Sequence, residues 1–205
     1  MRRIGLMGGS FNPIHCGHLN LARAALGSGH ADCVFFLPTG NPPHKHEGLA
    51  DKLDRLAMVE LAIAGEENMH ACREEIDREG VIYTVDTLTR LKDGMPDCDF
   101  VYLIGADTLR LLHTWRRPED VIQLCSFLVV MRPGEDDEQV ERLLAHWREK
   151  GAIIDLLPAP QMDVSSTDVR RMAGEGRSLE GYVPAAVEAY IRNHGLYECC
   201  EDLNR

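Results

Sequence analysis

The sequence predicts a single α/β domain in which a parallel β-sheet carries helices on both faces. Three observations favour this fold class. Short apolar runs alternate along the chain with amphipathic segments of helical length. The apolar runs are continuous, as is typical of strands that are buried on both faces of a parallel sheet. The length of 205 residues suits one domain, and the chain has no internal repeat and no linker-like segment.

The expected strands are the short apolar runs themselves. They comprise residues 3–7, 33–37, 100–104, 127–130 and 153–157. The first run leads directly into two glycines, and the second is followed by a loop rich in Pro, Gly and Asn. Both loops would lie at the same edge of a parallel sheet, beyond the carboxyl ends of its strands.

The expected helices are segments whose apolar residues recur with the 3.6-residue period of an amphipathic helix. They comprise residues 19–26, 52–64, 84–91, 108–112, 118–124, 138–150, 167–173 and 184–193. We expect Thr84 to cap its helix, and Pro184 to occupy the first turn of the last helix, which Gly195 follows. The helical end of the chain, from about residue 165 to residue 205, would belong to the single domain 1–205.

Composition and charge restrict the classes of partner. The 22 basic and 33 acidic residues give a net charge of −11, which disfavours binding to nucleic acid or to an anionic membrane but not to a small anionic substrate. No apolar run approaches the ~20 residues of a membrane span. The seven cysteines include no CxxC pair, which is typical of reduced thiols, so we expect a cytoplasmic protein.

The loop after the first strand is the strongest candidate for chemistry. Residues 8–18 read GGSFNPIHCGH, and an expected helix follows them. Gly8 and Gly9 would let the backbone approach a ligand, and the N–H groups of the helix start favour an anion. His15 and His18 are three residues apart, so both can face that anion. The commonest nucleotide-binding patterns, GxxxxGK[ST] and GxGxxG, are absent after this strand.

Two other interpretations of this loop remain open at this point. His15, Cys16 and His18 could bind zinc together with His44 and His46, although structural zinc sites favour paired cysteines that the chain lacks. Alternatively, the two loop histidines are exposed side chains of a surface turn.

Two further clusters could bind phosphate. His44, Lys45 and His46 follow the second strand, at the same edge of the sheet. Residues 164–171 (VSSTDVRR) present successive hydroxyl groups at a helix start, with Arg170 one turn further on. The first cluster could instead be a solvated loop. The second could be a capped surface helix in which Arg170 pairs with a neighbouring carboxylate.

Together these motifs resemble those of the bacterial nicotinate mononucleotide adenylyltransferases. Residues 9–18 are similar to the HxGH signature of the nucleotidyltransferase superfamily, and residues 165–170 to its SSTxxR phosphate motif. Further blocks follow in family order: PPHK at 42–45, YTVDTL at 83–88, IGAD at 104–107, Trp115, YI at 190–191 and GLY at 195–197. The blocks span nearly the whole chain and are specific in combination. Asn12 departs from the usual Asp, and we expect this departure to matter little.

The resemblance implies a Rossmann-like domain that transfers AMP from ATP to nicotinate mononucleotide, with release of pyrophosphate and no covalent intermediate. It implies catalytic roles for His15, His18 and Arg170. The ATP-binding residues that it implies are Gly9, Ser10, Phe11, His15, His18, Gly105, Asp107, Ser166, Thr167 and Arg170. The acceptor-binding residues that it implies are His44, Lys45, Thr84 and Trp115.

The resemblance also implies a set of partners. Mg²⁺ would arrive with ATP and be held by phosphates and water, with no protein ligand. Nucleic acid and membranes are not expected partners, and a homo-oligomer remains open. Trp115 would offer a flat face to the pyridine ring, unless it is simply a core aromatic. Backbone N–H donors near Thr84 and just after Trp115 would favour the carboxylate of nicotinate over the amide of nicotinamide.

Three alternative functions are weighed against this one. The first is adenylyl transfer to another acceptor, such as nicotinamide mononucleotide or phosphopantetheine; the 83–88 and Trp115 blocks argue against pantetheine. The second is a catalytically silent nucleotide sensor, against which the presence of His18 and Arg170 argues. The third is nucleic-acid binding, which the net charge of −11 disfavours.

Overall fold

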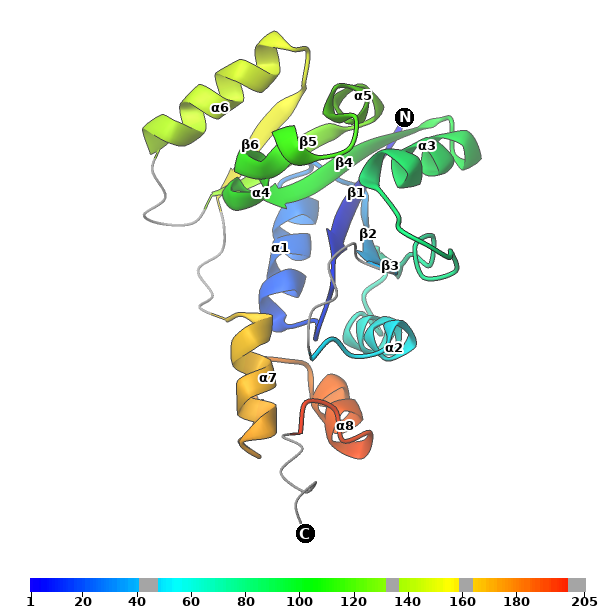
Figure 1. Ribbon diagram of the computed structural model, residues 1–205, viewed down its shortest axis with the longest axis vertical. Coiled ribbons are helices and arrows are strands. Elements are labelled where there is room, and N and C mark those ends of the chain that lie inside the picture. The colour runs from blue at the N-terminus through cyan, green and yellow to red at the C-terminus, as the bar shows by residue number, and fades with distance from the viewer. Residues whose placement is uncertain (41–47, 132–136, 159–163, 199–205) are drawn as a thin grey trace.

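The computed structural model describes residues 1–40, 48–131, 137–158 and 164–198. Its centre is a six-stranded sheet in the order β3-β2-β1-β4-β5-β6, in which all neighbouring strands are parallel (Figure 1). The strands are β1 Arg2–Gly9, β2 Cys33–Pro38, β3 Met69–Ala71, β4 Cys98–Gly105, β5 Ser126–Met131 and β6 Ile154–Pro158. The sheet confirms the predicted parallel α/β fold, and its strand order is Rossmann-like.

Helices connect the strands and close the chain. They are α1 Cys16–Gly27, α2 Lys52–Ala62, α3 Thr84–Gly94, α4 Ala106–Leu111, α5 Pro118–Leu124, α6 Asp137–Glu149, α7 Ser166–Gly174 and α8 Ala185–Asn193. A short 3₁₀ helix, Leu112–Thr114, extends α4. Each helix predicted from the apolar periodicity is therefore present, with ends that differ by a few residues.

Two hydrophobic cores cover the two faces of the sheet. Neighbouring residues of β1 point to opposite sides: Met7 faces the core shared with α1 and α2, and Leu6 faces the core shared with α3, α4, α5 and α6. The other long strands are divided between the cores in the same way, which explains why they are continuously apolar.

Helices α7 and α8 extend the first core beyond the sheet. Val169 of α7 and Val187 of α8 are fully buried in the same cluster as Phe11 and Ile14 from the loop after β1. In Figure 1 both helices lie below the sheet, with α7 near the beginning of α1 and α8 next to α2. This packing brings the C-terminal motif, which begins α7, to the carboxyl end of β1.

Three details of the secondary structure differ from the predictions. The strand β3 was not expected, because it has only three residues and His70 interrupts its apolar character; it forms by pairing with β2. Tyr83, rather than Thr84, occupies the N-cap of α3, and no side-chain cap hydrogen bond is made there. Pro184 is the N-cap residue of α8 rather than part of its first turn.

The five cysteines in the described part of the chain are all free thiols. None of the described helices combines the length and the apolar character that crossing a bilayer requires.

Candidate active site

The candidate site lies where the strand order reverses. From β1 the chain continues to β2 and β3 on one side of β1. It then returns to β4 on the other side of β1, and β5 and β6 follow there. In parallel α/β sheets, ligands bind in the crevice outside the carboxyl ends of the strands at this switch point. The loop of residues 9–18 comes at the end of β1. Gly105 is the last residue of β4, and Asp107 lies just after it in α4. Both sets of predicted nucleotide-binding residues therefore lie at this crevice.

The two glycines that end β1 have different environments. A Cβ atom at Gly8 would collide with the hydroxyl group of Tyr102, whereas one at Gly9 would meet only the Phe11 ring at 3.5 Å, an ordinary contact distance. The packing of Tyr102 by itself therefore requires glycine at position 8, whatever part Gly8 has in ligand binding. Gly9 is left open as a ligand contact.

Phe11 anchors the loop through its side chain. Its ring is 2% exposed and packs on the rings of Phe36 and His18, with centroids 5.7 and 5.1 Å away. The residue has a φ angle of +45°, in the left-handed region that costs energy for a residue with a side chain. Only the backbone of Phe11 is therefore available to a nucleotide, and the buried ring holds the loop in this conformation.

The two histidines of the loop form one unit at the start of α1. His15 is the N-cap residue, and its backbone N–H donates to Nδ1 of His18 at 3.2 Å. The two imidazole rings are stacked, with centroids 3.8 Å apart. His15 is only 8% exposed, so the interpretation as exposed turn histidines is wrong. The prediction that both rings face the same side is confirmed.

His18 is held neutral by its surroundings. Burial, and secondarily the nearby His15, lower the pKa of His18 well below its ordinary value of 6.5. Because Nδ1 of a neutral His18 accepts the hydrogen bond from His15, its proton resides on Nε2. His18 therefore carries a neutral N–H donor at Nε2 and not a full positive charge.

Helix α7 joins the loop after β1 through two hydrogen bonds. The Ser166 hydroxyl donates to the carbonyl oxygen of Pro13 at 2.9 Å, and Nη1 of Arg170 donates to the carbonyl oxygen of Asn12 at 2.8 Å. Nη2 of Arg170 also donates to the Thr167 hydroxyl at 3.3 Å. Arg170 thus bonds to the loop and to its own helix, and no ion pair of the described residues includes it. The HxGH and SSTxxR segments meet as predicted.

The N-terminus of α7 also carries a local cap. Ser165 is the N-cap residue, and its hydroxyl accepts from the backbone N–H of Asp168 at 3.1 Å. The Asp168 carboxylate in turn accepts from the Ser165 hydroxyl at 2.5 Å and pairs with Arg171 at 3.3 Å. The helix is therefore capped, but by Ser165 and not by Ser166 or Thr167, while Ser166 and Arg170 donate to the loop after β1.

Asn12 is a hub whose importance the sequence analysis missed. Its side-chain oxygen accepts from the backbone N–H of Ala50 at 3.1 Å and from the hydroxyl of Tyr197 at 2.8 Å. Its amide nitrogen donates to the carbonyl of Gly48 at 3.0 Å. With Arg170 on its carbonyl, Asn12 links four separate segments of the chain while being 5% exposed. The departure from the usual Asp also has a structural consequence, because an ionised Asp could not donate the hydrogen bond to Gly48.

Arg55 is a second hub that the sequence did not reveal. The side chain, on α2, is 1% exposed. Its guanidinium donates to the carbonyl oxygens of Ala50, Ser10 and Thr39 at 3.1, 2.7 and 2.7 Å, and to that of Gly40 at 3.3 Å. It therefore ties the ends of β1 and β2 to the start of α2. Its position within an amphipathic helix is the only sequence signal, and that pattern predicts an exposed or half-buried charge.

The residues after β4 are accessible. Gly105 is the N-cap of α4, and a Cβ atom there would meet nothing within 4 Å. Asp107, in the first turn of α4, has a side chain that is 75% exposed and pairs with Arg110 at 2.9 Å. Both residues are thus open to a ligand in the crevice, as a binding role requires.

The predicted acceptor residues Thr84 and Trp115 meet at Tyr102. The ring of Trp115 packs edge-on against that of Tyr102, with centroids 5.8 Å apart, and the Tyr102 hydroxyl has a hydrogen bond with the Thr84 side chain. Burial raises the pKa of Tyr102. Trp115 is half-buried, so one part of it packs on the second core while the rest remains accessible.

Two of the predicted residues cannot be placed. His44 and Lys45, with His46, lie outside the described residues. The zinc interpretation depends partly on these histidines, and within the described ranges no group of three or more His, Cys, Asp or Glu side chains could hold a metal ion. The described residues therefore offer no protein cage for Mg²⁺ or zinc, and we assign no step to a metal held by the protein.

Comparisons with known proteins decide the family. A profile of the cytidylyltransferase-like family matches residues 6–172. A protein of Neisseria meningitidis serogroup B (strain ATCC BAA-335 / MC58), described as a probable nicotinate-nucleotide adenylyltransferase, is 44% identical over 97% of this chain and 100% of its own. This chain belongs to the nicotinate-nucleotide adenylyltransferase family. A relative of the same description from Synechococcus sp. (strain JA-3-3Ab) is 42% identical over 96% of this chain and 95% of its own.

Solved structures agree with the fold of this adenylyltransferase family member. The Plasmodium falciparum nicotinic acid mononucleotide adenylyltransferase complexed with NaAD has a TM-score of 0.78 at 18% identity, covering 96% of this chain and 98% of that chain. A putative nicotinate-nucleotide adenylyltransferase from Vibrio parahaemolyticus has a TM-score of 0.64 at 20% identity, covering 96% of each chain.

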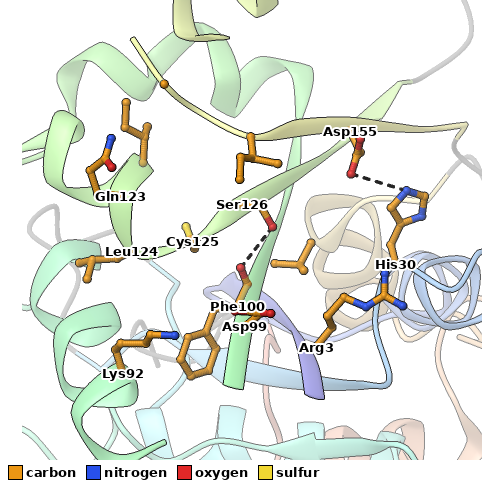
Figure 2. A pocket seen from close by; sticks show the side chains of 14 residues that line it. Arg3, His30, Lys92, Asp99, Phe100, Gln123, Leu124, Cys125, Ser126 and Asp155 are labelled. Carbon is orange, nitrogen blue, oxygen red and sulfur yellow. Dashed lines mark hydrogen bonds and ion pairs between the residues drawn. The ribbon is translucent and has the colours of Figure 1, made fainter. Parts of the chain in front are cut away.

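A separate pocket lies at the end of the sheet opposite the candidate active site, where the strands begin. It has a volume of about 480 Å³ and is lined by Arg3, His30, Lys92, Asp99 and Asp155 together with apolar side chains (Figure 2). Lys92 donates to a backbone carbonyl, and His30 lies 3.9 Å from Asp155. Its lining comes from the amino ends of strands together with parts of α3, α5 and neighbouring loops, and it includes none of the motifs by which this chain resembles the adenylyltransferases. We assign it no role in nucleotide binding.

Proposed function

We infer that this protein transfers AMP from ATP to nicotinate mononucleotide, forming deamido-NAD and pyrophosphate. The observation that carries this conclusion is the meeting of the HxGH loop and α7 at the switch point, through Arg170 and Ser166. Membership of the adenylyltransferase family supports it. The structurally similar Plasmodium falciparum enzyme has been solved with NaAD and with APC.

The reaction needs alignment and neutralisation of phosphates. An oxygen of the acceptor phosphate attacks the α-phosphorus of ATP, a new P–O bond forms, and the bond to pyrophosphate breaks with its electron pair on the leaving group. Because the attacking phosphate is already ionised, no general base and no covalent intermediate are needed. Catalysis then consists of positioning and electrostatic stabilisation.

His15, His18 and Arg170 carry the catalytic contacts in this proposal. His18 donates through Nε2 to the ATP phosphates as charge develops on the leaving pyrophosphate, and the stacked His15 keeps that ring in place. Arg170 supplies the full positive charge that the neutral histidine lacks. Its planar fork bonds to the loop through Nη1, and the remaining N–H groups serve phosphate oxygens.

The remaining ATP contacts come from the loop, α4 and α7. Gly9, Ser10 and the backbone of Phe11 lie beside the nucleotide, and Ser166 and Thr167 bind the β- and γ-phosphates at the start of α7. Gly105 lets adenosine approach the end of β4, and Asp107 accepts a hydrogen bond from a ribose hydroxyl. Support for the last two roles is that both positions are accessible at the switch point. Mg²⁺ accompanies ATP, held by phosphate oxygens and water.

The acceptor occupies the side of Thr84 and Trp115. The pyridine ring packs on the accessible part of Trp115, whose orientation is set by Tyr102. Backbone N–H groups near Thr84 and after Trp115 donate hydrogen bonds to the nicotinate carboxylate. His44 and Lys45 serve the phosphate of the mononucleotide. Support for this arrangement is the common contact of Thr84 and Trp115 with Tyr102.

The proposal includes the organisation and setting of the chain. Residues 1–205 form one nucleotidyltransferase domain, in which the part from about 165 onward contributes the SSTxxR motif; the core shared by α7, α8 and the β1 loop supports this view. The partners are the two small-molecule substrates, in the cytoplasm. A homo-oligomer remains compatible with the fold.

The test is product formation with each acceptor in parallel. The purified protein is mixed with ATP, Mg²⁺ and either nicotinate mononucleotide, nicotinamide mononucleotide or phosphopantetheine. Chromatography should show deamido-NAD from the first acceptor, with pyrophosphate released in equal amount. His18→Ala, purified in the same way, controls for adenylyltransferase carried over from the expression host. The absence of a dinucleotide from any acceptor, or a clear preference for phosphopantetheine, would refute the proposal.

A further inference from the structure

Arg116 is a cation fixed beside the proposed acceptor side of the site. Its guanidinium carbon lies 4.5 Å from the centroid of the Tyr83 ring, well within the range of a cation–π contact. Arg116 directly follows Trp115, and Tyr83 directly precedes Thr84. The contact therefore bridges the two segments to which we assign acceptor binding, and it places the charge between them.

The charge of Arg116 is not used in an ion pair. The ion pairs of the described residues leave Arg116 out, whereas its neighbour Arg117 pairs with Asp120. Arg116 is exposed, and stacking on Tyr83 occupies the face of the guanidinium while its N–H edges stay available to a ligand.

An acidic group lies on the same side of the site. Glu75 accepts a hydrogen bond from the Thr87 hydroxyl at 3.0 Å and interacts electrostatically with Tyr102, the residue that Thr84 and Trp115 both contact. The carboxylate of Glu75 repels a ligand that brings its own carboxylate to this side of the site. The neighbouring positive charge of Arg116 offsets that repulsion, so it makes binding of a ligand with a carboxylate more favourable.

We propose that Arg116 is a specificity-determining residue that favours an acceptor whose pyridine ring carries a carboxylate over one that carries a carboxamide. The proposal rests on the proposed function. With the ring packed on Trp115, its substituent is within reach of the next residue in the chain. A guanidinium donates charge-assisted hydrogen bonds to a carboxylate, whereas a carboxamide is neutral and directs its own N–H groups at the same donors.

The experiment compares the two mononucleotides in wild type and in three variants. For each protein, kcat/KM is measured for nicotinate and for nicotinamide mononucleotide at saturating ATP, and the ratio of the two values is the readout. Arg116→Gln should lower the ratio about tenfold, chiefly through a higher KM for nicotinate mononucleotide, as expected for loss of a charge-assisted bond at an exposed site. Arg116→Lys should lie between, because a point charge remains without the planar fork.

Arg117→Gln is the matched control. It removes the same charge one residue further along the chain, from a side chain that pairs with Asp120 and stacks on no acceptor segment. Its ratio should remain within about twofold of the wild-type ratio, because an exposed charge pair contributes little. An unchanged ratio in Arg116→Gln would overturn the proposal. An equal loss in Arg117→Gln would also overturn it, since the general field of the surface would then be responsible.

Salt dependence gives a second readout that needs no variant. The two acceptors differ by one charge, so their ratio isolates the effect of charge at the pyridine ring. Raising the salt from about 0.05 M to about 0.5 M should lower the wild-type ratio, because screening becomes effective at shorter distances. The ratio in Arg116→Gln should stay nearly constant. A wild-type ratio that does not respond to salt would contradict the proposal, while failure of wild type to adenylate either acceptor would refute the proposed function itself.

Discussion

The ATP side and the acceptor side of the candidate site are built by different interactions. On the ATP side, segments more than 150 residues apart are joined by direct hydrogen bonds, such as those from Ser166 to Pro13 and from Arg170 to Asn12. On the acceptor side, Thr84 and Trp115 are connected through the buried Tyr102, and the charge of Arg116 is exposed. The ATP side is held together by hydrogen bonds from side chains to backbone carbonyl oxygens, and the acceptor side by aromatic packing.

This difference has a chemical reason. Developing charge on a leaving pyrophosphate is best stabilised by donors whose positions do not change during the reaction. Arg55 and Asn12 secure such positions because they hold several carbonyls at once from buried sites. A flat pyridine ring needs a flat apolar face and one discriminating substituent contact. We therefore expect substitutions on the ATP side to have larger effects than those on the acceptor side.

The largest effect should come from Arg55→Met, which tests whether the ATP side depends on its buried hub. The substitution leaves the carbonyls of Ser10, Thr39 and Ala50 without their donor. Each buried carbonyl that loses its partner costs about 1–3 kcal/mol, so the free energy of unfolding should fall by about 3 kcal/mol or more. Urea denaturation measures the change. Arg55→Lys keeps the charge and part of the hydrogen bonding, so its free energy of unfolding should fall less. Equal stability of wild type and both variants would show that the ATP side does not depend on Arg55.

His18→Ala should impair turnover without a comparable loss of stability. Removing one transition-state donor typically lowers kcat by about 10²–10³-fold. His18→Asn sharpens the test, because its side-chain oxygen can replace Nδ1 as the acceptor of the His15 N–H while nothing replaces Nε2. The Asn variant should fold like wild type and still show the loss in steady-state assays. Normal turnover in His18→Asn would mean that Nε2 does not face the phosphates.

Trp115→Ala should affect the acceptor alone. Loss of ring stacking costs about 1–3 kcal/mol in comparable complexes, so kcat/KM for nicotinate mononucleotide should fall while KM for ATP changes little. Trp115→Phe, which keeps an aromatic face next to Tyr102, should retain most of the activity. Steady-state kinetics with each substrate varied in turn provide the measurement. An Ala variant that unfolds while the Phe variant is normal in every respect would favour a core role for Trp115.

The smallest effect concerns pH. The pKa of His18 is well below 6.5 in the folded protein, mainly because of burial, so the unfolded chain takes up a proton that the folded chain refuses. The free energy of unfolding should therefore decrease as the pH falls below about 6.5, by at most about 1.4 kcal/mol per pH unit for this group. This dependence should be weaker in His18→Asn than in wild type between about pH 7.5 and about pH 5.5. Identical profiles would show that His18 titrates normally.

Much of the site could be predicted from short-range patterns. The glycine loop after a buried strand, the HxGH spacing and the hydroxyl-rich start of α7 are local features, and the structure brings them together as expected. The packing reason for the glycine at position 8 was missed because it lies in Tyr102, which is 94 positions away in the chain and adjacent only in the folded sheet. The start of α3 at Thr84 was predicted correctly, but its cap was misassigned, because the N-cap residue is Tyr83, which makes no side-chain cap hydrogen bond.

The sequence by itself determined the period of the helices, the continuous apolar strands and the residue types at the crevice, because each depends on neighbours within a few positions. The tertiary structure alone decided which carbonyls Arg55 and Asn12 satisfy, that His18 is neutral, and that Arg116 lies over Tyr83. These properties depend on burial and on partners from distant segments. A polar side chain has the same sequence signature whether it faces water or joins four segments of a buried network, so only the fold distinguishes the two.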